Sequence, residues 1–248
     1  MSGHSHWAGI KQRKGVNDAK RAGVFTKIAK IVTIAARDGG SGDPTTNFHL
    51  RLAIDQARSF NMPKDNIDRA IKRGTGELKD GTEIVENTYE GYGPGNVAMI
   101  IKTVTDSANR TVSEIKSLFT KGGGKFVPSG SLNFLFQSVG VIETVALDSL
   151  DIEATELAII EAGADDFEHN ETNDESTPRD FFVFTAPDQL QVVSENLRAQ
   201  GFTIRSASLA YRPTQTVELT GEALTQYENF REKIENHDDV DRVYDNLA

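Results

Sequence analysis

The sequence predicts an α+β multidomain protein: an N-terminal three-helix domain followed by two ferredoxin-like α/β-plait domains, one inserted in the other. Three observations support this fold class. Apolar residues recur every three or four positions in the first third of the chain, strand-like and helix-like segments alternate afterwards, and the net charge changes sign near residue 80. At 248 residues the chain is long enough for two or three domains, each with its own core.

The first predicted helix, NDAKRAGVFTKIAKIVTIAAR, covers residues 17–37. Asn17 is a suitable N-cap, and the pair Gly39-Gly40 is typical of a helix end. The apolar side chains recur at helical spacing, so one side of this helix is expected to pack on a core. These side chains are Val24, Ile28, Ile31, Val32 and Ala35.

A second helix, TTNFHLRLAIDQARSF, is predicted at residues 45–60 after the turn GGSGDP. Its inward side chains by spacing are Leu50, Ile54 and Ala57.

The third helix, NMPKDNIDRAIKRG, covers residues 61–74, with Pro63 near its first turn and Gly74 as its end. Its apolar side consists of Ile67, Ala70 and Ile71. Three short helices with polar turns predict a small bundle, and GTGELKDGTEIVENT, residues 74–88, is interpreted as a linker.

Beyond the linker the pattern predicts alternating strands and helices. We expect one strand within 88–104, one or two within 131–145, and further strands at 180–187, 203–213, 216–220 and 240–247. Helices are expected at 107–124, 152–164, 188–201 and 221–238. This order contains enough strand-helix-strand units for two ferredoxin-like modules. The predicted domains are a basic arm at 1–16, a three-helix domain at 17–80, an α+β domain made of 81–133 and 209–248, and an inserted α+β domain at 134–208.

Charge is distributed unevenly along the chain. Residues 1–80 carry 15 lysines and arginines against 8 acidic residues, a net +7, and residues 81–248 carry 12 against 29, a net −17. A basic end on an acidic body is typical of a protein whose basic end meets a polyanion. A domain that is basic without such a partner is the alternative.

Composition and motifs argue against several classes. The absence of cysteine excludes disulfides and thiolate chemistry, the five histidines are scattered, and no H-E-x-x-H or G-x-S-x-G motif occurs, so we expect no enzyme and no cofactor. EGYGPG and KGGGKF lack the spacing of phosphate-binding loops, and HNETNDEST lacks that of an EF-hand. Ser2-Gly3-His4 could chelate Cu(II) or Ni(II) if Met1 is removed, which is an incidental property of such termini.

No apolar run is long enough for a membrane helix, and the polar start lacks a signal peptide, so we expect a cytoplasmic protein.

The residues with the strongest binding chemistry lie near the N-terminus. The arm has no periodic apolar face, and it combines Trp7, suited to stacking on a base, with cations suited to phosphates: Lys11, Arg13 and Lys14. On the first helix, a basic ridge of Lys20, Lys27, Lys30 and Arg37 lies beside the apolar stripe, and Arg21 adds a further cation.

Several blocks of the sequence together resemble the YebC/PmpR family, the bacterial relatives of a mitochondrial translational activator of cytochrome oxidase. They are GHSHWAGIKQRK, DAKRAGVFTKIAK, NMPKDNIDRAIKRGTG, YEGYGPG, NRTVSEIKSLFTKGGG and EAGADD, and the similarity extends over nearly the whole chain. The resemblance implies the same three-domain fold and a regulator of gene expression without catalysis of its own.

The family resemblance leaves two functions open, a DNA-binding transcriptional regulator and a factor that binds ribosomal RNA on the translating ribosome. A protein-interaction module without nucleic acid is a third possibility. Three helices are compatible with a helix-turn-helix, although GGSGDPTT is longer than the usual tight turn of that motif. The expected partners are DNA or ribosomal RNA and the ribosome, with no membrane, and a monomer is favoured.

Overall fold

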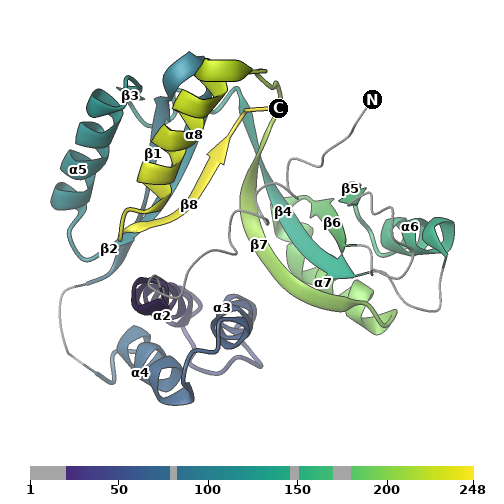
Figure 1. Cartoon of the computed structure of the whole chain (residues 1–248). Helices are drawn as coiled ribbons and strands as arrows, with labels where there is room; N and C mark the ends of the chain where they lie inside the picture. The colour runs from purple at the N-terminus through teal and green to yellow at the C-terminus, as the bar shows by residue number, and fades with distance from the viewer. Residues whose placement is uncertain (1–20, 79–82, 146–150, 170–179) are drawn as a thin grey trace. The chain divides into compact units, whose positions relative to one another are not determined.

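The computed structural model describes residues 21–78, 83–145, 151–169 and 180–248 (Figure 1). In these residues it contains seven α-helices and two four-stranded sheets, which confirms the predicted fold class. The chain forms two compact units, one of which includes residues 138–210 and is inserted within the other, formed by residues 19–137 and 211–248.

The larger unit begins with a three-helix bundle of α2 (Arg21–Asp38), α3 (Phe48–Ser59) and α4 (Lys64–Gly74). The core of the bundle contains Ile28, Val32, Leu50, Ala57 and Ile67, all of them buried. A β-carbon on Gly74 would lie 2.3 Å from the Thr33 carbonyl oxygen, so glycine permits the close approach of α4 to α2. The bundle therefore uses the apolar faces predicted from the sequence.

Two connections of different length join the three helices. Between α2 and α3, Asn47 caps α3 by accepting a 3.0 Å hydrogen bond from the Leu50 amide, and its Nδ2 donates to the Ala35 carbonyl at 2.8 Å. Between α3 and α4 the chain needs only residues 60–63, in which Asn61 adopts a left-handed conformation with φ 57°. The short, tight turn thus precedes α4 and not α3.

The rest of the larger unit is a sheet of order β3-β1-β2-β8 with antiparallel pairing throughout. Its strands are β1 (Val85–Tyr92), β2 (Ala98–Thr105), β3 (Lys125–Val127) and β8 (Val240–Asp245). Helices α5 (Ala108–Lys121) and α8 (Gly221–Glu235) cover one face, where the rings of Phe119 and Phe230 meet edge to face at 5.3 Å (Figure 1). Here a hairpin joins the two central strands, β1 and β2, and the edge strands β3 and β8 follow α5 and α8.

The sequence prediction fails at three places in this sheet. Strand β1 begins at Val85, inside the predicted linker, and β3 is a three-residue strand with too little sequence for a pattern. TVELT, predicted as a strand, has only an isolated bridge from Val217 to Leu247. Strand β1 also contains Gly91, where a β-carbon would lie 2.3 Å from the Phe119 ring, so α5 can pack closely on β1 only because this residue is glycine. Glycine is unfavourable in strands, and its presence makes β1 harder to predict from the sequence.

The inserted unit has a sheet of order β5-β6-β4-β7. Its strands are β4 (Phe136–Val145), β5 (Asp166–His169), β6 (Asp180–Thr185) and β7 (Thr203–Pro213), the first and last of which continue into the larger unit. Helix α6 (Ile152–Glu161) follows β4, and α7 (Leu190–Ala199) follows β6 after a short 3-10 turn. The order and connections are those of a ferredoxin-like fold, with Phe181, Val183, Ile142 and Ile159 buried in the core.

Candidate nucleic-acid interface

The basic ridge predicted on α2 is directed toward the α+β part of the same unit. Three of its cations, Lys27, Lys30 and Arg37, bond to groups near β1, β2, β8 and the end of α8. The fourth, Lys20, lies outside the described residues, as does the side chain of Arg21. In this structure the ridge therefore supplies internal contacts.

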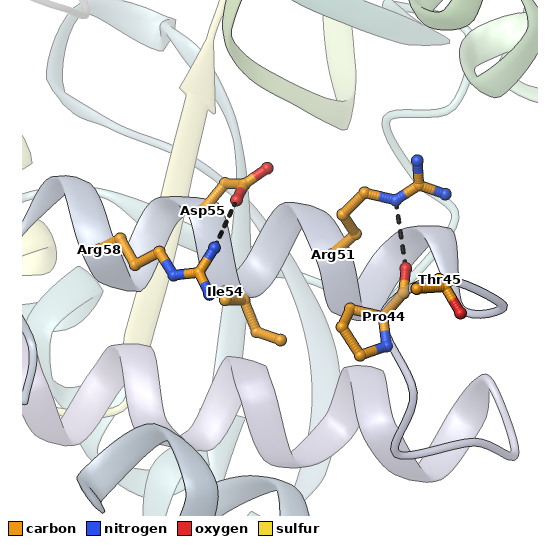
Figure 2. Close-up of a pocket in the computed structure, with 6 residues that line it drawn as sticks. All are labelled: Pro44, Thr45, Arg51, Ile54, Asp55 and Arg58. Atoms are coloured by element: carbon orange, nitrogen blue, oxygen red, sulfur yellow. Dashed lines mark hydrogen bonds and ion pairs between the residues drawn. The ribbon is translucent and has the colours of Figure 1, made fainter. Parts of the chain in front are cut away.

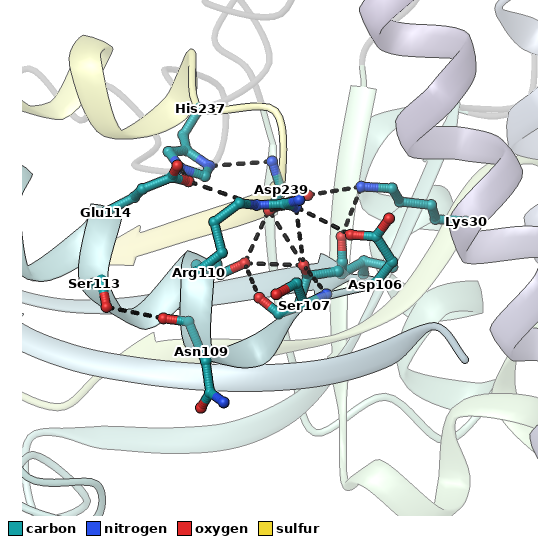
Figure 3. Close-up of polar contacts among 12 residues, drawn as sticks. Lys30, Asp106, Ser107, Asn109, Arg110, Ser113, Glu114, His237 and Asp239 are labelled. Atoms are coloured by element: carbon teal, nitrogen blue, oxygen red, sulfur yellow. Dashed lines mark hydrogen bonds and ion pairs between the residues drawn. The ribbon is translucent and has the colours of Figure 1, made fainter. Parts of the chain in front are cut away.

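Lys30 makes the strongest of these contacts. Its ammonium donates to Asp239 Oδ1 at 2.7 Å and to the Val104 carbonyl at 3.2 Å, and the side chain is only 15% exposed (Figure 3). Asp239 is 3% exposed and follows α8, just before β8. The pair thus fixes the three-helix bundle to the α+β part with a largely buried, charge-assisted hydrogen bond.

The other oxygen of the Asp239 carboxylate is also fully used. Oδ2 accepts hydrogen bonds from Arg110 at 2.7 Å, from Thr111 at 2.8 Å and from Thr105 at 3.2 Å (Figure 3). Burial alone would raise the pKa of Asp239, but the hydrogen bonds from Lys30, Arg110 and Thr111 outweigh it and hold the pKa well below its usual range. The carboxylate is therefore charged at every physiological pH.

Lys27 and Arg37 are also engaged. Lys27 Nζ donates at 3.2 Å to the carbonyl of Glu235, the last residue of α8, where the helix dipole favours a cation. Burial lowers the pKa of Lys27, against the opposing effect of Asp238 and Asp241. Arg37 bonds to Asp38 at 2.8 Å and to the Ile84 carbonyl. A phosphate that approaches either side chain would compete with these partners.

Other cations of the bundle do face solvent, although they are not among the predicted binding residues. Arg58, Lys64, Arg69 and Lys72 are exposed, and in the described part of the chain the side chains of the last three have no ion-pair or hydrogen-bond partner. Arg69 and Lys72 lie about one turn apart on the side of α4 opposite to the buried Ile67 and Ala70. The helical period of the sequence places Arg69 and Lys72 opposite the apolar side of α4, and this position could have identified them as solvent-facing.

A shallow pocket of about 280 Å³ lies along the outer side of α3 (Figure 2). Arg51 and Arg58 lie at its two ends and Asp55 between them, with Asp55 3.6 Å from Arg58. Arg51 Nε donates to the Pro44 carbonyl at 3.2 Å, and Figure 2 shows the rest of its guanidinium directed away from that bond. The remaining donors of the two arginines could hold a phosphate.

The arm residues proposed for binding, Trp7, Lys11, Arg13 and Lys14, lie outside the described residues, together with Ser2-Gly3-His4. Their roles stay predictions.

One group of side chains in the larger unit has metal-ligand chemistry. Glu114, His237 and Asp239 each place a ligand atom within 4.8 Å of the others. However, Asp239 already binds Lys30 and Arg110, and His237 uses both ring nitrogens, with Nε2 2.9 Å from Glu114 and Nδ1 accepting from the Asp239 amide. A metal ion would have to replace two cations, so we interpret the group as an ion-pair network.

Among the described residues, no helix combines the length and the apolar character that a membrane span requires.

Comparisons with known proteins cover the whole chain. The family described as "TACO1/YebC protein N-terminal domain" matches residues 5–77, and "TACO1/YebC second and third domain" matches residues 84–247. A probable transcriptional regulatory protein of Persephonella marina is 46% identical over 100% of this chain and 96% of its own length, and one from Caldanaerobacter subterraneus is 42% identical over 100% and 98%. The crystal structure of a conserved hypothetical protein from Aquifex aeolicus is similar with a TM-score of 0.85 and 38% identity, over 98% of this chain and 97% of that one.

Proposed function

The chain belongs to the TACO1/YebC family, and on this basis we propose that it regulates gene expression by binding nucleic acid, without catalysing a reaction. The names of its relatives, probable transcriptional regulatory proteins, support a regulatory role. The observation that carries nucleic-acid binding is the division of charge, because residues 1–80 hold a net +7 in a chain whose net charge is −10.

The cations available for phosphates are those that the fold leaves at the surface. Lys27, Lys30 and Arg37 are used within the larger unit, whereas Arg58, Arg69 and Lys72 on α3 and α4 face solvent. Contacts of such side chains to phosphates fix position and do not read bases. We therefore assign the phosphate contacts to α3 and α4 in addition to the arm.

Duplex DNA is the first candidate target. Helices α3 and α4 are joined by the four residues 60–63, with Asn61 in the left-handed conformation, which is the connection typical of a helix-turn-helix motif. In that motif the second helix enters the major groove. Helix α4 would then be the recognition helix, with Arg69 and Lys72 on its exposed side.

Ribosomal RNA is the second candidate, and the charge on α4 favours it. Asp65 and Asp68 are exposed on the same helix, and carboxylates are repelled by the closely spaced phosphates of a duplex groove. A folded RNA touched at separate points avoids this repulsion, and Trp7 of the arm suits stacking on an unpaired base.

Crosslinking in cells, followed by sequencing of the bound nucleic acid, separates the two candidates. Discrete promoter DNA among the products supports a transcriptional regulator, and ribosomal RNA supports a translation factor. Recovery of neither above a strain lacking the protein contradicts nucleic-acid binding.

A charge variant tests the assigned surface. In Arg58→Gln/Arg69→Gln/Lys72→Gln we expect weaker binding to duplexes of any sequence, with a salt dependence shallower by up to about 0.9 per lost contact. The matched control, Lys121→Gln/Lys125→Gln/Lys233→Gln, removes the same charge from exposed sites outside the bundle and should keep the original slope. Equal slopes in both variants would show that only net charge matters.

The arm requires its own test. Trp7→Ala should cost about 1–3 kcal/mol of binding free energy if the indole stacks on a base. Deletion of residues 1–14 should leave the melting temperature unchanged while binding is lost. A truncated protein that binds as well as the full chain would remove the arm from the interface.

A further inference from the structure

Helix α6 of the inserted unit carries two large apolar side chains on its solvent side. Ile159 and Thr155 are buried against the unit, yet Leu157 and Ile160 are 56% and 55% exposed. These two side chains lie three positions apart and are neighbours on the helix surface. Adjacent exposed apolar side chains of this size mark a surface that can be covered by another protein.

Carboxylates surround this apolar pair. Glu153 lies one turn before Leu157 on the same side, and Glu156 and Glu161 lie at its flanks by helical spacing. Residues 151–169 hold seven acidic residues and neither lysine nor arginine. Residues 138–210 contain three arginines and 15 acidic residues, which gives this segment a net charge of −12. The segment is therefore more negative than the whole chain, whose net charge is −10.

We propose that the solvent face of α6 is a docking surface for a basic amphipathic segment of a partner protein. Apolar side chains of that segment would cover Leu157 and Ile160, and its lysines or arginines would face Glu153 and Glu161. The charge of the surface selects this partner. Nucleic acid and anionic lipid are repelled by it, and a second copy of the same face would set one acidic rim against another.

The inserted unit offers a matched control site. Val192 on α7 is 50% exposed, a value similar to that of Leu157. Its neighbour Gln191 hydrogen-bonds to Glu195 at 3.0 Å, and no other large apolar side chain of α7 is exposed. Val192 is thus a single exposed apolar residue of the ordinary kind, while Leu157 and Ile160 form a pair.

The test uses the full chain and three labelled synthetic peptides of about 14 residues, long enough for a marginal helix. One places leucine at helical spacing among lysines, the second replaces leucine with serine, and the third replaces lysine with glutamate. By fluorescence anisotropy we expect the Leu/Lys peptide to bind at least about tenfold more tightly than the other two, since a few buried apolar anchors carry most binding energy.

Variants then locate the site. Leu157→Gln/Ile160→Gln should weaken the Leu/Lys peptide by about tenfold or more, and Val192→Gln should leave it unchanged. Glutamine preserves helix propensity, and a circular dichroism spectrum checks the fold. Glu153→Gln/Glu161→Gln should weaken binding and flatten its salt dependence.

Three results would overturn the proposal. The first is that the Leu/Lys peptide does not bind at micromolar concentration. The second is that the peptide with serine in place of leucine binds as tightly as the Leu/Lys peptide. The third is that the Leu157→Gln/Ile160→Gln variant binds the Leu/Lys peptide as tightly as the unchanged chain does. A fourth overturning result would come from sedimentation of the protein without peptide. If the unchanged chain is a dimer and the Leu157→Gln/Ile160→Gln variant is a monomer, the face binds a second copy of the chain.

Discussion

Two sets of cations in the three-helix bundle have the same chemistry and different surroundings. On α2, Lys27 and Lys30 point toward the α+β part of the unit and bond to the Glu235 carbonyl and to Asp239. On α4, Arg69 and Lys72 point into solvent, and in the described residues no carboxylate pairs with them. The comparison teaches that a basic helical face identifies a binding surface only after the neighbouring element is known.

The physical difference between the two sets is desolvation. Removing a lysine from water is costly, so Lys30 is stable in its position only because Asp239 and the Val104 carbonyl accept its hydrogen bonds. An exposed arginine keeps its hydration and loses little when a phosphate approaches. Mutations should therefore affect stability at the α2 set and binding at the α4 set.

The largest effect is expected for Asp239→Asn. The change leaves Lys30 and Arg110 beside an uncharged amide in a site that is 3% exposed. We expect unfolding free energy to fall by about 3 kcal/mol, as when one partner of a buried pair is removed. Urea denaturation measures it. The exposed neighbour provides the control, because Asp238→Asn should change stability by less than about 0.5 kcal/mol.

A paired experiment tests the contrast between the two sets directly. Lys30→Gln should cost about 1.5–3 kcal/mol of stability, the value of a hydrogen bond to a charged group, and leave nucleic-acid affinity unchanged. Lys72→Gln should do the reverse, with stability altered by less than about 0.5 kcal/mol and weaker binding to duplex DNA. If Lys30→Gln weakens binding in a fully folded protein, the α2 ridge reaches the nucleic acid after all.

A smaller effect follows from pH. The pKa of Asp239 is lowered in the folded state, so its stabilising contribution is complete above the unfolded value of about 3.9 and is lost as pH falls toward the folded value. We expect wild-type stability to drop relative to Asp239→Asn by on the order of 1 kcal/mol between about pH 5 and pH 3. Denaturation curves of both proteins across this range provide the measurement. A difference that does not change with pH would contradict a charged Asp239 in the network.

The smallest effect is expected for the exposed pair on α3. Arg58 and Asp55 are 3.6 Å apart with side chains 71% and 46% exposed, so Asp55→Asn should change stability by less than about 0.5 kcal/mol. Binding to nucleic acid should become slightly tighter, because a carboxylate that competes for Arg58 is removed. Weaker binding in this variant would place Asp55 itself in contact with the target.

Much of the fold follows from the sequence. The apolar period predicts α2, α3 and α4 with their inward residues, and Leu50, Ile54 and Ala57 are all buried. The helix predicted at 107–124, ended by its three glycines, and the strand predicted at 203–213 are also present in the structure, as α5 and β7. By contrast, β3 has three residues and β1 lies partly in a polar stretch, so neither has enough periodic sequence to be recognised.

By itself the sequence determined the helical faces, the domain order and the charge of each segment, because these depend on residues close together in the chain. Only the tertiary structure decided which basic face is free. Lys30 and Asp239 are more than 200 positions apart and meet at 2.7 Å, and no local pattern encodes that meeting. The cations of α2 lie beside the apolar stripe of their helix and those of α4 lie opposite theirs, yet a helical wheel leaves both sets outside the packed face. They differ because β2, β8 and the end of α8 pack beside α2, and a charge that loses its water must find its partner within the fold.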